Sequence, residues 1–174
     1  MYANGQDAPS YLQDEGGLAR LIDDWGDRLL RLCTLYLGDV HLAEDAVQET
    51  LLRAWRNADR FRGTGSEITW ITRIAINVCK SYLRSPWKRR RAPAEELDKL
   101  LAPADDPQVD DTLPRAIMAL PRPYREVIIL HYYQELKARE IADILHINVS
   151  TVTARLSRAR NMLRESLKGW YYDE

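Results

Sequence analysis

Five side chains between positions 70 and 84 have the chemistry and the spacing of a nucleic-acid contact. Steps of three and four residues place Trp70, Arg73, Asn77, Lys80 and Arg84 on one face of a helix. Arginine and lysine bind backbone phosphates, and an asparagine amide both donates and accepts hydrogen bonds at a base edge. The face predicts a DNA or RNA contact centred on Asn77. For Trp70, packing in the core is the favoured interpretation and a base contact is the alternative.

The segment just before this face contains two glycines, Gly63 and Gly65. Because glycine lacks a side chain, such a loop lets an unstacked base come close to the backbone. Arg62, Gly63 and Ser66 are therefore candidate contacts for nucleic acid, and Ser66 also has the residue type of a helix N-cap.

A second candidate surface lies on the predicted helix that follows Asp39. Its exposed face carries a mixed polar and apolar patch of Asp45, Gln48, Glu49, Leu52 and Arg53. A solvated helix surface would have a similar composition. The patch also suits a basic helical partner, because charge complementarity sets the register and an apolar centre adds affinity.

A third candidate surface lies on the last predicted helix, 149–168. Val152, Leu156 and Ala159 point inward, and a shorter helix at 138–145 precedes it across a tight turn with Asn148 as the expected N-cap. This arrangement suggests a helix-turn-helix that reads the major groove of DNA. The candidate DNA contacts are Thr151, Thr153, Ala154, Arg155, Ser157, Arg158 and Arg160.

Helical periodicity extends over most of the chain and predicts an all-α protein with two small domains. We expect a helical bundle in 18–91, from helices at about 18–37, 40–55 and 66–84, after a disordered stretch at 1–17. A four-helix domain is expected in 113–170, from helices at 113–120, 124–133, 138–145 and 149–168. Residues 92–113 carry a net charge of −6 between blocks of +2 and +3, which predicts an acidic flexible linker at 92–112.

Other functional classes find little support in the 174 residues. No stretch approaches the roughly 20 apolar residues of a membrane helix, and two cysteines are too few for a disulfide framework. Cys33 and Cys79 lie on apolar faces, so we expect core residues in a cytoplasmic protein. His41, Glu44 and Asp45 have the helical spacing of a metal site but no further ligands nearby. We expect neither a cofactor nor a metal, and no enzymatic activity.

Several motifs together resemble the extracytoplasmic-function (group IV) sigma factors of RNA polymerase. The segments at 43–50, 53–55 and 61–63 are similar to the family's polymerase-binding region, and 70–77 with 82–84 to its minus-ten-reading region. The segments at 119–121, 125–127, 140–142 and 151–160 resemble its C-terminal helix-turn-helix. Four positions depart from the family pattern: His146 and Ser150 stand where glycine is usual, Lys137 replaces a serine cap, and Thr153 stands where a basic residue is common.

The resemblance implies a set of partners and a role for each surface. Core RNA polymerase would bind through its β′ coiled coil at the 45–53 patch and through its β flap, and promoter DNA would be read at the minus-ten and minus-thirty-five elements. It also implies promoter melting by capture of an unstacked base. An anti-sigma factor, often membrane-anchored, would be the inhibitor. The alternative is a free-standing helix-turn-helix regulator, although a net charge of −1 speaks against tight binding of DNA without polymerase.

Overall fold

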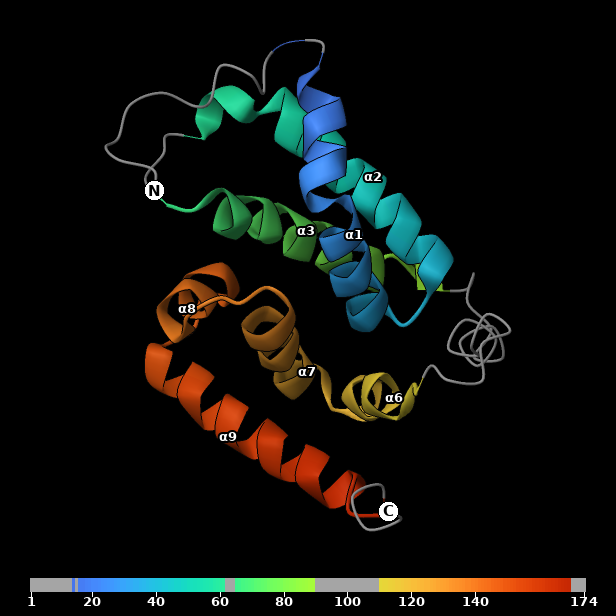
Figure 1. The fold of residues 1–174 in the computed structure, drawn as a ribbon, viewed down its shortest axis with the longest axis vertical. Coiled ribbons are helices and arrows are strands. Elements are labelled where there is room, and N and C mark those ends of the chain that lie inside the picture. Colours follow the sequence, from blue (N-terminus) through green and yellow to red (C-terminus); the bar gives the residue numbers. More distant parts are fainter. Residues whose placement is uncertain (1–13, 15, 62–64, 90–109, 170–174) are drawn as a thin grey trace.

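The computed structural model describes residues 14, 16–61, 65–89 and 110–169, and every regular element in these ranges is helical (Figure 1). The all-α prediction is therefore confirmed. In the described part of the first half there are three long helices and two short ones: α1 (Gly17–Leu37), α2 (Val40–Arg56), η2 (Ala58–Arg60), α3 (Glu67–Arg84) and α4 (Pro86–Arg89). The second half contains α6 (Thr112–Ala119), α7 (Arg122–Ile128), η3 (Ile129–Tyr133), α8 (Ala138–Leu145) and α9 (Val149–Ser166). Most of the predicted linker and most of residues 1–17 lie outside the described residues.

Local signals set the ends of the first three helices where the sequence predicts them. Gly38 follows α1 with a left-handed φ of 70°, which glycine adopts at little cost, and its N–H donates to the carbonyl of Thr34 at 2.8 Å. The Asp39 carboxylate accepts the backbone N–H of Leu42 at 2.9 Å and caps α2. The Ser66 hydroxyl likewise accepts the N–H of Thr69 at 3.2 Å and caps α3.

The segment predicted as one helix at 124–133 is different in the structure. Its helix begins two residues earlier, at Arg122, because Pro123 fits the first turn, where its missing N–H costs nothing. Its second half is a π-helical turn, η3, in which the N–H of Gln134 donates to the carbonyl of Ile129 at 3.2 Å. Gln134, at the end of this turn, is only 1% exposed.

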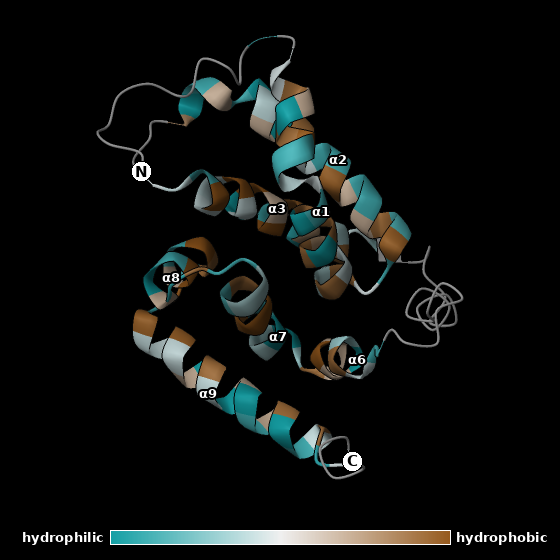
Figure 2. Cartoon of the chain, in the orientation of Figure 1, coloured by the Kyte–Doolittle hydropathy of each residue, from teal (hydrophilic) through white to brown (hydrophobic). Residues whose placement is uncertain are grey.

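The helices form a layered bundle in which α6, α7 and α8 lie between α3 and α9 (Figure 1). Helix α1 packs against α2 and α3 on one side and against α6, α7 and η3 on the other. Figure 2 shows apolar and hydrophilic residues interleaved along each long helix, as amphipathic helices require. A single hydrophobic core consequently runs from Leu21 in α1 to Ala159 in α9 and includes residues of both halves.

The two cysteines lie side by side in this core. The Sγ atoms of Cys33 on α1 and Cys79 on α3 are 3.6 Å apart, and both residues are fully buried. The hydrogen bond to Cys33 and burial together raise the pKa of Cys79 far above its usual value. The prediction that the cysteines are core residues is confirmed.

We expect neither thiol to react with iodoacetamide in the folded protein at neutral pH. The thiolate is the nucleophile, and burial disfavours both its formation and the approach of the reagent. Mass spectrometry should find both cysteines unmodified in the native protein and both alkylated after unfolding in guanidinium chloride. Rapid alkylation of Cys79 without unfolding would show that this part of the core opens locally.

Neither a membrane-spanning helix nor a cluster of metal ligands occurs among the described residues. No helix among them is long and apolar enough to cross a membrane. Within the described ranges, no three His, Cys, Asp or Glu side chains come together as a metal site requires. His41 instead lies with its Nδ1 3.7 Å from a carboxylate oxygen of Glu44.

Candidate nucleic-acid and polymerase interfaces

The predicted patch on α2 forms one wall of a surface groove of 470 Å³. Asp45, Gln48 and Arg53 are exposed, Glu49 is half-buried, and Leu52 leaves 36% of its surface open to solvent. The groove is lined by all five predicted residues together with Arg56 and Tyr82. It has an apolar centre at Leu52 and charges of both signs around it, which is the composition of a protein-binding site.

Tyr82 lines this groove, although the sequence predicted it only as a core residue. The tyrosine ring is buried in the core as predicted, but its hydroxyl reaches the groove and donates to Oε2 of Glu49 at 2.9 Å. Burial and the neighbouring Glu49 raise the pKa of Tyr82 above its ordinary value. Glu49 also pairs with Arg53 one helical turn later. Two neighbours thus hold the Glu49 carboxylate in place.

The predicted nucleic-acid face on α3 is mostly open to solvent. Arg73, Asn77 and Arg84 are exposed and Lys80 is half-buried. Trp70 is also half-buried: it packs against the core, and its ring centroid lies 5.2 Å from that of Phe61. This placement agrees with the favoured interpretation of Trp70 as a packing residue. Ser66 is exposed at the start of the same helix, whereas Arg62 and Gly63 lie outside the described residues.

The last helix presents its predicted DNA face to solvent. Val152, Leu156 and Ala159 are buried, so α9 is anchored along one side. Thr153, Ala154, Ser157 and Arg158 are exposed on the other. A shallow hollow of 460 Å³ lies along this face, lined by Tyr124, Ser150, Thr151, Ala154, Arg155 and Arg158. Tyr124 was not predicted for the site; its hydroxyl accepts a hydrogen bond from Arg158 at 3.4 Å.

Two details of the helix-turn-helix bear on the sequence predictions. His146 has a left-handed φ of 56°, which explains why glycine is the usual residue there. Asn148 occupies the N-cap position of α9 as predicted, but its side chain makes no cap hydrogen bond. The φ and ψ of Asn148, −72° and 149°, are those of an extended N-cap residue. Helix α9 therefore begins after Asn148 without a hydrogen bond from the asparagine side chain. A helix N-terminus without a side-chain cap keeps its N–H groups available to an anion such as phosphate.

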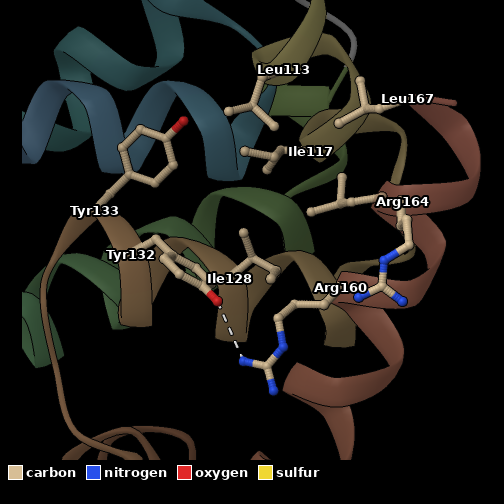
Figure 3. A pocket seen from close by; sticks show the side chains of 9 residues that line it. Leu113, Ile117, Ile128, Tyr132, Tyr133, Arg160, Arg164 and Leu167 are labelled. Carbon is tan, nitrogen blue, oxygen red and sulfur yellow. Dashed lines mark hydrogen bonds between the residues drawn. The ribbon is translucent and has the colours of Figure 1, made fainter. Parts of the chain in front are cut away.

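Arg160 lies on a different surface from the other predicted DNA contacts. Its guanidinium donates to the hydroxyl of Tyr132 at 3.3 Å, at the rim of an apolar groove of 510 Å³ (Figure 3). The groove lies between α6, the α7–η3 segment and α9. It is lined by Leu113, Ile117, Ile128, Tyr132, Tyr133, Arg160, Leu163, Arg164 and Leu167. Because Leu113 and Tyr132 are 40% and 52% exposed, the groove offers apolar surface to a partner.

Family comparison covers both halves of the chain. Residues 21–90 match Sigma-70 region 2, and residues 110–163 match Sigma-70, region 4. The ECF RNA polymerase sigma factor SigW of Bacillus subtilis is 34% identical over 89% of this chain and 91% of its own length. The RNA polymerase sigma factor SigV of the same organism is 31% identical over 86% of this chain and 90% of its own.

A solved structure gives the same result. The sigma factor RpoE of Bartonella quintana, in complex with the anti-sigma factor NepR, is 29% identical to this chain with a TM-score of 0.68. The match covers 89% of this chain and 99% of that one. Both the α2 groove and the face of α3 fall within region 2, and the faces of α9 within region 4.

Proposed function

The chain belongs to the extracytoplasmic-function RNA polymerase sigma factors, alternative sigma factors that direct promoter-specific transcription, and we propose which of its surfaces perform each step. The α2 groove binds core polymerase through the β′ coiled coil. The observation that carries this proposal is Leu52, an exposed apolar side chain ringed by Asp45, Glu49, Arg53 and Arg56. A basic amphipathic helix fits such a site, since it buries its apolar residues on Leu52 and pairs its cations with the carboxylates.

The face of α3 reads and opens the minus-ten element. Arg73, Lys80 and Arg84 hold backbone phosphates, and Asn77 contacts a base edge. The segment from Arg62 to Ser66 contributes to the capture of an unstacked base, which makes melting a binding event and not a covalent step. Such a protein needs no catalytic residue and no cofactor.

The face of α9 reads the minus-thirty-five element from the major groove. Arg158 is the only exposed residue there whose fork can make a bidentate contact with guanine, and Thr153 and Ser157 supply single hydrogen bonds. Thr151, Ala154 and Arg155 border the same hollow, where Arg155 contacts phosphate. Arg160 was predicted as a DNA contact. Its hydrogen bond to the Tyr132 hydroxyl instead favours a role at the rim of the apolar groove on the other side of α9.

Replacing Arg158 with alanine should weaken binding to the native upstream element about tenfold and flatten the preference at one base pair. The expected loss of binding energy lies at the lower end of the usual range for one base contact. The reason is that Arg158 must give up its hydrogen bond to the Tyr124 hydroxyl when it turns to DNA. The matched control is Arg155→Ala, which should weaken all sequences alike and reduce the salt slope by about one unit. Holoenzyme binding to a library of upstream elements measures both. An unchanged base preference in Arg158→Ala would reassign Arg158 to phosphate.

The apolar groove of Figure 3 is our proposed site for the β flap. Its floor is formed by leucine and isoleucine side chains, and Arg160 and Arg164 border it. An apolar partner segment with acidic flanks suits both features. We further propose an anti-sigma factor as the inhibitor, as in the complex of RpoE with NepR, and action in the cytoplasm, where polymerase and promoter DNA are found.

The test of the whole proposal is promoter binding with and without core polymerase. Transcripts made by reconstituted holoenzyme on genomic DNA first identify a promoter, and a labelled duplex of that promoter is then titrated with the protein. A sigma factor should bind the duplex specifically only when core enzyme is present. Equal, specific binding without core enzyme would favour the free-standing helix-turn-helix regulator.

A further inference from the structure

We propose that residues 170–174 of this chain occupy the apolar groove of Figure 3 in the free protein. The segment reads Trp-Tyr-Tyr-Asp-Glu, lies outside the described residues and directly follows Gly169, where they end. Its docking depends only on the groove and the segment, whereas the consequence for polymerase binding rests on the proposed function.

The groove exposes apolar surface that folded proteins normally cover. Leu113 and Tyr132 are 40% and 52% exposed at its edge, and leucine and isoleucine side chains form its floor. Its volume of 510 Å³ lies within the range of about 300–1,000 Å³ that is typical of ligand sites. A contiguous apolar hollow of this kind on a protein surface marks a binding site.

Two cations border the groove without a carboxylate partner among the described residues. Arg160 and Arg164 lie one turn apart on α9, and both are exposed. Arg160 donates to the hydroxyl of Tyr132 at 3.3 Å, and Arg164 donates to Oδ1 of Asn161 at 3.1 Å. The occupant that suits this groove is therefore apolar and carries carboxylates.

Residues 170–174 have this chemistry. Trp170, Tyr171 and Tyr172 supply large rings with few rotatable bonds, so they bury much apolar surface at a low cost in conformational entropy. Asp173 and Glu174 follow them directly, and carboxylates form charge-assisted hydrogen bonds with guanidinium groups. The segment thus matches the groove both in apolar character and in charge.

The segment begins beside the groove and is long enough to follow it. Helix α9 ends at Ser166, and residues 167–169 form a turn. Leu167 lies at one end of the groove and Arg160 at the other (Figure 3). Arg160 lies seven residues before Leu167, about 10 Å along the helix axis, and five extended residues span up to roughly 17 Å. A chain that reverses at this turn brings its two carboxylates within reach of both arginines.

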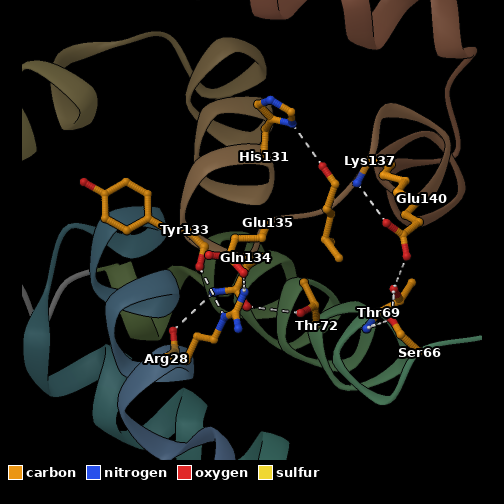
Figure 4. A network of polar contacts seen from close by, with 11 residues as sticks. Arg28, Ser66, Thr69, Thr72, His131, Tyr133, Gln134, Glu135, Lys137 and Glu140 are labelled. Atoms are coloured by element: carbon orange, nitrogen blue, oxygen red, sulfur yellow. Dashed lines mark hydrogen bonds and ion pairs between the residues drawn. The ribbon is translucent and has the colours of Figure 1, made fainter. Parts of the chain in front are cut away.

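One wall of the groove is held in place by α1. Tyr132 and Tyr133 belong to the π-helical turn η3, and the carbonyl of Tyr133 accepts the Nε–H of Arg28 on α1 at 3.3 Å (Figure 4). Gln134 in turn donates from Nε2 to the carbonyl of Arg28 at 3.2 Å. Because these bonds fix η3, an occupant meets a preformed site and pays little to order it.

A tethered segment competes with every other partner of the same groove. A short tether gives the segment an effective concentration in the millimolar range, so even weak contacts keep the groove covered much of the time. A partner then binds with an affinity reduced by the fraction of protein in which the groove is free. If that partner is the β flap, the segment lowers the affinity of the protein for core polymerase.

Fluorine NMR of the full chain labelled with 5-fluorotryptophan tests whether Trp170 is buried. The chain has five tryptophans, and Trp170→Phe and Trp87→Phe identify the two resonances that matter. The change in chemical shift between H₂O and D₂O measures contact with solvent, and Trp87, which is 73% exposed, is the internal reference. Trp170 should show less than half the solvent shift of Trp87. An equal shift in the folded protein would overturn the proposal and leave the groove to another occupant.

A pair of variants tests whether the groove is what protects Trp170. Arg160→Ala combined with Arg164→Ala should raise the ratio of undocked to docked segment about tenfold, since each exposed ion pair changes such an equilibrium by up to about fivefold. Arg139→Ala removes an exposed arginine from α8 and, as the matched control, should leave Trp170 protected. Undiminished protection in the folded double variant would overturn the proposal. Protection that rises with protein concentration would also overturn it, because a second copy would then supply the segment.

The second experiment removes the segment and measures binding to core polymerase. If the segment covers the groove about 80% of the time, a chain that ends at Gly169 should bind core enzyme about fivefold more tightly than wild type. Failure of the docking and failure of the proposed function give different results. An exposed Trp170 overturns the docking whatever the affinity for core enzyme. A protected Trp170 with unchanged affinity confirms the docking and removes the β flap from this groove.

Discussion

Core RNA polymerase is expected to bind the Leu52→Glu variant about 100-fold more weakly than wild type. Leu52 is the exposed apolar centre of the α2 groove, and truncation or charge at such a centre typically costs more than 2 kcal/mol. The new carboxylate would be desolvated beside Asp45 and Glu49 and would repel them. Titration of fluorescently labelled protein with core enzyme measures the change in affinity.

A matched variant separates the groove from a general effect of surface charge. Ile22→Glu changes an apolar side chain that is 49% exposed on α1, and it should bind core enzyme as wild type does. Both substitutions lie at exposed positions, so the melting temperature should change little in either. Wild-type affinity in folded Leu52→Glu, or an equal loss in Ile22→Glu, would remove the α2 groove from the polymerase interface.

The helices and most of the exposed faces could be predicted because the signals for them are local. Helical periodicity identified the buried sides of α1, α2, α3 and α9, and Gly38, Asp39 and Ser66 ended or capped helices where their chemistry allows it. The outward residues of α9 followed from its inward ones, since positions three and four apart share a face. These predictions required no knowledge of which helices touch.

What could not be predicted depends on contacts between distant residues. Tyr82 has the apolar spacing of a core residue, and only the approach of α2 brings its hydroxyl to Glu49. Gln134 ends an apolar helix with no sequence signal, yet packing against α1 buries it completely. Arg160 is two residues from Arg158, but a rotation of about 200° along the helix turns it to another groove.

Open-complex formation on a duplex promoter is expected to fall about 5- to 150-fold in Asn77→Ala, with core binding unchanged. Losing a base contact typically costs about 1–3 kcal/mol, and the melted state of the promoter bears that cost if Asn77 holds an unstacked base. Asn77 is exposed, and its side chain makes no hydrogen bond to the described residues. Alanine is the better helix former, so the variant should be at least as stable as wild type. Permanganate reactivity of thymines in the promoter measures the open fraction.

A template with a pre-opened bubble distinguishes the two roles that Asn77 can have. If Asn77 assists melting, most of the defect should disappear on the bubble, because the unstacking energy has already been supplied. If Asn77 discriminates between bases, the defect should persist on the bubble. Its size should then depend on which base stands at the promoter position that Asn77 contacts. Arg73→Ala is the control on the same face: a phosphate contact should weaken binding to every sequence and lower its salt dependence. An unchanged open fraction on duplex DNA would leave Asn77 as an ordinary surface residue and move the reading of the minus-ten element elsewhere on region 2.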